Sequence, residues 1–210
     1  MPSHLRTLIA LAGLALGAAP PAGASTPCCA DPSAFRYEPL PADGSVDVAI
    51  DARSPTFEFQ SGPSAFRAFA LPPASHPYLV EVRSYLSGGA DPRRAKVFYP
   101  VVAVLTDDFL VSRSTDLEAL RFDLPLLERT TAPAYRVVLA IDPSNAHERY
   151  LVVYTPAPLR EARTLATADT PEGAAEAAKL AFLGAAPYGK LRITLKAGDP
   201  VPATTEPPAR

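Results

Sequence analysis

The sequence of 210 residues has no tryptophan, three histidines and two cysteines. Few side chains are therefore available to bind a transition metal. His76 and His147 lie far apart, and neither has a histidine or cysteine neighbour, whereas zinc ligands usually come in closely spaced pairs. We expect both histidines at the surface and no metal site. The lack of tryptophan also removes the largest flat ring that could stack on a sugar.

Long apolar runs and a strong net charge are also missing. After the N-terminal region, no run reaches the roughly 20 residues of a membrane-spanning helix, and the longest, Val97–Leu105, contains Pro100. The formal net charge is −2, which gives no general attraction to nucleic acid. We therefore expect no transmembrane segment after the N-terminal region and no nucleic-acid partner.

Motifs for common catalytic sites are missing as well. The nearest match to a nucleophile elbow is Gly62–Phe66, which lacks the final glycine and joins two expected strands, so Ser64 is interpreted as a turn residue. Asp107 and Asp108 lack the spacing of a calcium loop, and no phosphate-binding glycine loop occurs. We expect a protein that is not an enzyme and has no cofactor. A hydrolase with two distant carboxylates is the less favoured alternative.

The N-terminal residues have the layout of an export signal. His4 and Arg6 give a weakly positive start, Leu8–Ala19 is apolar, and Ala22-Gly23-Ala24 resembles a signal peptidase site. The pattern predicts a signal peptide over residues 1–24, cleavage after Ala24 and a periplasmic location.

Two adjacent cysteines, Cys28 and Cys29, follow this segment. Lipidation at Cys28 is disfavoured because Pro27 occupies a position that requires a small residue. A disulfide suits an oxidising compartment, either between these neighbours, with strain in the ring, or to another protein. Free thiols remain a further alternative, since a redox pair usually has the spacing C-x-x-C. We favour the disulfide.

Alternation of apolar and polar residues predicts a mainly β protein. The 25 prolines require short elements. In Tyr78–Leu86, for example, Val80 and Val82 point inward while Glu81 and Arg83 face water. We expect a β-sandwich or jelly-roll-like domain of about ten short strands over residues 46–197, after an N-terminal segment over residues 25–45. The expected strands are Val46–Ile50, Thr56–Gln60, Ala65–Leu71, Tyr78–Leu86, Val97–Leu105, Phe109–Ser112, Leu120–Leu124, Arg136–Asp142, Arg149–Thr155 and Lys190–Lys196.

One or two short α-helices complete the prediction. Thr170–Leu183 begins with a capping threonine and a proline, and Gly184 is placed to end it. A weaker helix is expected over Pro158–Leu165. Residues 198–210 form a proline-rich tail with little to bury, and we expect this tail to be disordered.

The tyrosines allow two interpretations. Their rings could stack on sugars, or they could be core and cross-strand residues whose hydroxyls reach the rim of the sheets. We favour the second. The two interpretations concern seven of the eight tyrosines, namely Tyr37, Tyr85, Tyr99, Tyr135, Tyr150, Tyr154 and Tyr188.

Five segments resemble those of the MalM family, the maltose operon periplasmic proteins. They are Phe35–Leu40, Ser54–Phe59, Gly62–Pro72, Val97–Val102 and Arg149–Thr155. The resemblance covers most of the chain after the expected signal peptide. It implies a periplasmic protein associated with maltose or maltodextrin transport, and it carries no catalytic residue.

The hypothesis is therefore a non-enzymatic accessory protein that binds maltodextrin or another glycan. The alternative is an interaction module of the envelope without a sugar ligand. Such a module would hold an outer-membrane or periplasmic protein through its sheet edges or through Cys28 and Cys29. No ligand-binding residue is assigned by the sequence.

Overall fold

A computed structural model describes residues 26–88, 95–123, 132–160, 163–165 and 182–197. The expected signal peptide, the tail over residues 198–210 that is expected to be disordered, and most of the helix expected over Thr170–Leu183 lie outside these residues.

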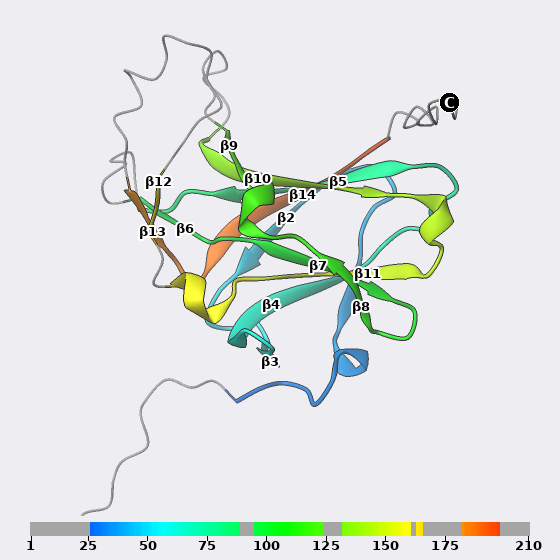
Figure 1. The fold of residues 1–210 in the computed structure, drawn as a ribbon, viewed down its shortest axis with the longest axis horizontal. Helices are drawn as coiled ribbons and strands as arrows, with labels where there is room; N and C mark the ends of the chain where they lie inside the picture. Colours follow the sequence, from blue (N-terminus) through cyan, green and yellow to red (C-terminus); the bar gives the residue numbers. More distant parts are fainter. Residues whose placement is uncertain (1–25, 89–94, 124–131, 161–162, 166–181, 198–210) are drawn as a thin grey trace, which may run out of the picture.

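Two β-sheets face each other, as Figure 1 shows, and the mainly β prediction is confirmed. We call them sheet A and sheet B. Sheet A has the order β1-β4-β11-β7-β8, with β3 also paired to β4, and sheet B has the order β2-β14-β5-β10-β9. The strands of sheet A are β1 (Tyr37–Pro39), β3 (Thr56–Phe59), β4 (Gly62–Ala70), β7 (Val101–Thr106), β8 (Val111–Ser114) and β11 (Glu148–Tyr154). The strands of sheet B are β2 (Gly44–Ile50), β5 (Tyr78–Tyr85), β9 (Arg121–Asp123), β10 (Ala134–Ile141) and β14 (Gly189–Ala197).

The main hydrophobic core fills the space between the two sheets. Alternate residues of each strand point into it, such as Val80 and Val82 of β5 and Leu151 and Val153 of β11, all fully buried. Burial of these branched side chains is the main force that holds the sheets together, at about 1.5–3 kcal/mol for each fully buried side chain. The sandwich follows directly from the period-2 pattern of the sequence.

A third, small sheet lies at one end of the sandwich. It consists of β6 (Lys96–Val97), β12 (Arg163–Leu165) and β13 (Phe182–Ala185), in the order β12-β13-β6. The run Val97–Leu105 is therefore not one strand. It divides before Pro100, because proline has no N–H to continue a ladder, and β7 begins at Val101 in sheet A.

Where the structure describes the segments expected to be helical, it shows other elements. Ala157–Arg160 forms a short 3-10 helix (η4), and Arg163–Leu165, the end of the weaker helix, is a strand paired with β13. Phe182 and Gly184 also lie in β13, so Gly184 does not end a helix. Cross-strand pairing overrides the local helical pattern at both places.

The hairpin of β3 and β4 is confirmed, with a shorter turn than expected. Phe59 pairs with Gly62, so β4 begins at Gly62 and not after Ser64. Gly62 has a φ of +96°, a conformation that glycine adopts without steric cost. Ser64 is therefore a buried strand residue, and its interpretation as a turn residue is wrong.

On the outer face of sheet B, the prediction that Glu81 faces water is wrong. Glu81 of β5 is buried, although alternation places it opposite Val80 and Val82. Its carboxylate accepts hydrogen bonds from Arg83 at 2.8 Å and from Lys196 at 2.9 Å. Long basic side chains from Glu81's own strand and from β14 thus cover the carboxylate, which the simple pattern cannot predict.

Candidate functional site

A cluster of aromatic side chains covers the outer face of sheet A, opposite the main core. We call these eight rings the aromatic face. Phe35 and Phe66 are buried at its centre, and the other six rings are half-buried around them. The aromatic face consists of Phe35, Tyr37, Phe57, Phe59, Phe66, Phe109, Tyr150 and Tyr154.

Ring contacts make this face continuous. At one end, Phe59 and Tyr154 stack with parallel rings 3.9 Å apart. At the other end, Phe109 stacks on Tyr150, with the ring centroids 4.9 Å apart. The ring centroids of Tyr37 and Tyr150 are 4.2 Å apart. Such pairs contribute about 0.5–1.5 kcal/mol each beyond their buried area.

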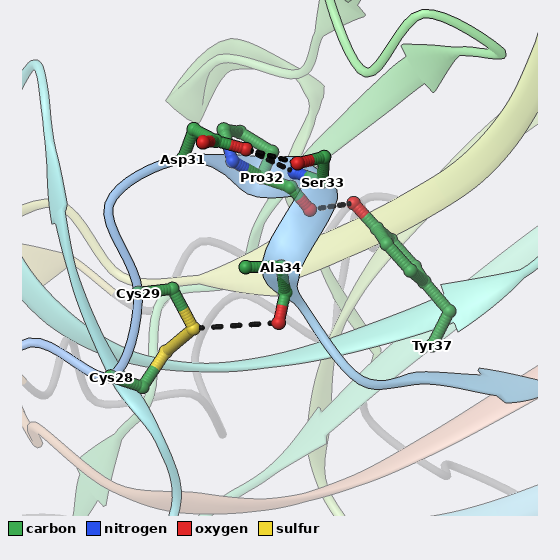
Figure 2. Close-up of a disulfide and its surroundings, with 7 residues drawn as sticks. All are labelled: Cys28, Cys29, Asp31, Pro32, Ser33, Ala34 and Tyr37. Carbon is green, nitrogen blue, oxygen red and sulfur yellow. Dashed lines mark hydrogen bonds between the residues drawn. A yellow bond between two sulfur atoms is a disulfide. The ribbon is translucent and has the colours of Figure 1, made fainter.

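The segment before β1 holds the centre of the aromatic face in place (Figure 2). Asp31 accepts the backbone N–H of Ser33 at 2.9 Å and begins the 3-10 helix η1 (Pro32–Ala34). The Tyr37 hydroxyl then donates to the Pro32 carbonyl at 2.8 Å. The turn directs Phe35 inward, where its ring lies 4.3 Å from that of Phe66.

Cys28 and Cys29 lie at the edge of the same face. Their sulfurs are bonded to each other, and Cys29 Sγ lies 3.6 Å from the Ala34 carbonyl oxygen (Figure 2). The Cys28 backbone N–H donates to the carbonyl of Thr56, at the start of β3, at 2.7 Å. Cys28 is exposed and Cys29 packs against the rings. The pair is therefore accessible beside the aromatic face, and its redox state stays a prediction.

Phe109 occupies an unusual backbone conformation in the turn between β7 and β8. Its φ is +61°, in the left-handed region that glycine and asparagine favour and bulky residues rarely adopt. The turn is closed by the Phe109 N–H, which donates to the Thr106 carbonyl, and by the Thr106 N–H, which donates to the Leu110 carbonyl. The conformation costs on the order of 1–3 kcal/mol, so the ring is held beside Tyr150 at a local energetic cost.

Burial changes the acidity of the tyrosines on this face. Burial raises the pKa of the Tyr37 hydroxyl well above its ordinary value, and the nearby Tyr150 adds to the effect. Burial also raises the pKa of Tyr154. Both of these hydroxyls are therefore protonated at physiological pH.

Of the residues considered for chemistry from the sequence, the structure brings His147 and Asp107 together. His76 and His147 are both exposed, as expected, and His147 Nδ1 lies 4.0 Å from a carboxylate oxygen of Asp107. Ser64 Oγ donates to the Ala65 carbonyl and accepts the Thr155 backbone N–H. Within the described ranges, no group of three or more histidine, cysteine or acidic side chains is placed to hold a metal ion.

Of the seven tyrosines considered from the sequence, two are core residues. Tyr99 and Tyr135 are buried beside the small sheet, with ring centroids 5.7 Å apart. Tyr37, Tyr150 and Tyr154 lie on the aromatic face, and Tyr188 is 42% exposed. Tyr37, Tyr150 and Tyr154 thus belong to a cluster outside the main core. The sequence could not reveal this because Tyr150 stacks on Phe109 and Tyr154 stacks on Phe59, and these phenylalanines come from distant segments.

With this geometry described, the chain can be compared with known proteins. No family model, no curated protein and no solved structure matches it. The MalM resemblance therefore stays a prediction. In the part of the chain that the structure describes, no helix is long and apolar enough to cross a membrane.

Proposed function

We propose that the chain is a non-enzymatic binding protein of the periplasm, associated with maltose or maltodextrin transport, and that its aromatic face binds a glycan. The periplasmic location rests on the signal-like pattern before Ala24. The sugar class rests on the MalM resemblance. The observation that carries the binding proposal is the set of half-buried rings outside the main core.

The physical argument concerns what these rings offer to a ligand. A contiguous apolar patch at the surface marks a binding site more often than chance exposure does. The flat face of a tyrosine or phenylalanine suits the C–H face of a pyranose, and a neutral sugar requires no charged partner. Phe109 fits this proposal because backbone strain concentrates at functional sites.

Calorimetric titration with maltoheptaose tests the proposal. We expect measurable heat for the wild-type protein and at least a tenfold loss of affinity in Phe109→Ala and Tyr150→Ala. Tyr188→Ala is the matched control, since Tyr188 is exposed and lies outside the aromatic face. The absence of heat up to millimolar ligand would contradict the proposal.

A second candidate function is favoured by the edge strand β8. Leu110 and Val111 are 67% and 63% exposed, and β8 ends the order of sheet A. An exposed edge can accept a strand from another protein through backbone hydrogen bonds. In this case Val111→Lys would abolish crosslinking to a specific envelope protein, whereas Tyr150→Ala would leave this crosslinking unchanged.

A further inference from the structure

The bond between Cys28 and Cys29 closes a very small ring. Because the two residues are adjacent, their α-carbons are 3.8 Å apart, below the roughly 4.4–6.8 Å that ordinary disulfides span. The ring contains the two side chains and the peptide bond between them, and it encloses no other residue. A disulfide outside the usual span is more easily reduced. The adjacency of the two cysteines therefore favours exchange of this bond over a structural role.

The two sulfurs differ in their access to solvent. Cys28 is exposed, whereas Cys29 is partly buried and packs against the aromatic face. Figure 2 shows the Cys29 sulfur directed toward Ala34, whose carbonyl oxygen is 3.6 Å away. In thiol–disulfide exchange, an incoming thiolate must reach one sulfur of the bond. The geometry thus makes Cys28 Sγ the sulfur that is attacked and Cys29 Sγ the leaving group.

The Ala34 carbonyl suits the reduced state of Cys29. A disulfide sulfur has no proton to donate, but a thiol S–H is a weak hydrogen-bond donor. A Cys29 thiol at the position of the present sulfur can donate to this oxygen while its side chain stays beside the rings. The structure therefore contains the acceptor that the product of exchange needs.

The backbone around the pair is held by contacts that involve neither sulfur. The Cys28 N–H donates to the Thr56 carbonyl at 2.7 Å, which ties the segment to the start of β3. Further along, the Tyr37 hydroxyl donates to the Pro32 carbonyl at 2.8 Å. The segment can therefore keep its path when the disulfide opens, so exchange does not require the domain to unfold.

We propose that Cys28 is a site of thiol–disulfide exchange that accepts a thiol from another molecule. The chain has two cysteines in all, so no third cysteine can supply the attacking thiol. The incoming thiolate attacks Cys28 Sγ and forms a mixed disulfide with it. The Cys28–Cys29 bond breaks, and its electron pair leaves with Cys29 Sγ, which takes a proton from water.

A second thiol completes the reduction of the pair. Its thiolate attacks the sulfur of the first thiol in the mixed disulfide and releases Cys28 as a thiolate. Two thiols are thereby oxidised to one disulfide, and the cysteine pair gains two electrons. This chemistry does not depend on glycan binding by the aromatic face.

Reduced glutathione is the probe that tests the proposal. The wild-type chain, purified without reductant, is incubated briefly with glutathione, trapped with N-ethylmaleimide and studied by tandem mass spectrometry. We expect glutathione on Cys28 and the maleimide on Cys29, with at least tenfold more glutathione on Cys28 than on Cys29. The matched control is the same protein in urea, where adjacent cysteines become equally accessible and the ratio should fall to about one.

Two single variants measure the difference in access separately. The Cys28 thiol of Cys29→Ser should react with iodoacetamide at least tenfold faster than the Cys29 thiol of Cys28→Ser, and the two rates should converge in urea. Reduced thioredoxin in place of glutathione distinguishes the source of the thiol. Faster exchange with thioredoxin would support a protein thiol, faster exchange with glutathione would support a small-molecule thiol, and either result supports exchange at Cys28.

Three results on the wild-type chain would overturn the proposal, whether or not the variants fold. The first is glutathione divided equally between the two cysteines, or mainly on Cys29, in the folded protein. The second is neither an adduct nor reduction of the pair in millimolar glutathione. The third is a chain that carries free thiols, or a lipid at Cys28, before glutathione is added.

Discussion

Arg113 donates to both carboxylate oxygens of Glu148, from Nε to Oε1 at 2.8 Å and from Nη2 to Oε2 at 2.9 Å. The Glu148 side chain is only 3% exposed, and Ser112 also donates to it. Arg113 Nη2 further donates to the Ala140 carbonyl of β10. One arginine on the edge strand of sheet A therefore connects to β11 in its own sheet and to sheet B.

Arg113→Lys should destabilise the fold although it keeps the charge. Lysine cannot make the paired hydrogen bonds, and a buried carboxylate with fewer donors is costly. We expect a loss of about 1–3 kcal/mol in the free energy of unfolding, measured with urea. Arg67→Lys is the control, because the Arg67–Glu38 pair is partly exposed and should change stability by less than about 1 kcal/mol. Equal losses of unfolding free energy in the two variants would contradict the argument that burial of Glu148 makes its ion pair with Arg113 important for stability.

Glu81 should make stability depend on pH in the acidic range. Burial opposes its ionisation, but hydrogen bonds from Lys196 and Arg83 outweigh burial and leave the pKa below its ordinary value. A carboxyl whose pKa is lower in the folded state stabilises the fold above its unfolded pKa of about 4.3. That stabilisation is lost as the pH falls from the pKa of Glu81 in the unfolded state through its lower pKa in the folded state.

Glu81→Gln should consequently lower the melting temperature at pH 7. The difference in melting temperature between this variant and the wild type should shrink as the pH falls below about 4. Melting curves between pH 3 and 7 measure this effect. Glu58→Gln, at an exposed position of β3, should follow the wild-type curve. If the Glu81→Gln curve ran parallel to that of the wild type at all pH values, Glu81 would not be a source of the acid sensitivity.

Alternation of residue types was sufficient to predict most of the sandwich. Val46–Ile50 lies within β2 and Tyr78–Leu86 closely matches β5, because a strand with one face in the core must alternate. The place of β6 in the small sheet and the strand at Arg163–Leu165 depend on pairing with distant segments, which local sequence does not contain.

The candidate sites were harder to predict for the same reason. The aromatic face combines rings from distant segments, and nothing near Tyr150 in the sequence indicates Tyr37 or Phe109. Phe109 lies in a short polar turn where a glycine or asparagine would be usual, so its positive φ is visible only in the structure.

Gly189 allows a close approach between β14 and the segment before β7. A Cβ at this position would lie 2.5 Å from Cβ of Phe98, whose side chain is fully buried. Gly189→Ala should therefore force the core apart and lower the free energy of unfolding by about 1–3 kcal/mol. Gly184→Ala is the control, since its nearest neighbour, Lys96 Cγ, is 3.9 Å away. Thermal unfolding of both variants provides the measurement, and an unchanged Gly189→Ala protein would show that Phe98 moves freely.

The bond between Cys28 and Cys29 should contribute little to global stability. A disulfide stabilises chiefly by closing a loop in the unfolded chain, and adjacent residues enclose no intervening residue. We therefore expect Cys28→Ser/Cys29→Ser to unfold within about 0.5 kcal/mol of the wild type, whereas loss of a structural disulfide typically costs 2–5 kcal/mol. Mass spectrometry of the exported wild-type chain should show a mass two hydrogens below that of the reduced form. A lipid adduct at Cys28 would contradict the disulfide, and a large loss of stability in the double variant would show that the bond supports the fold.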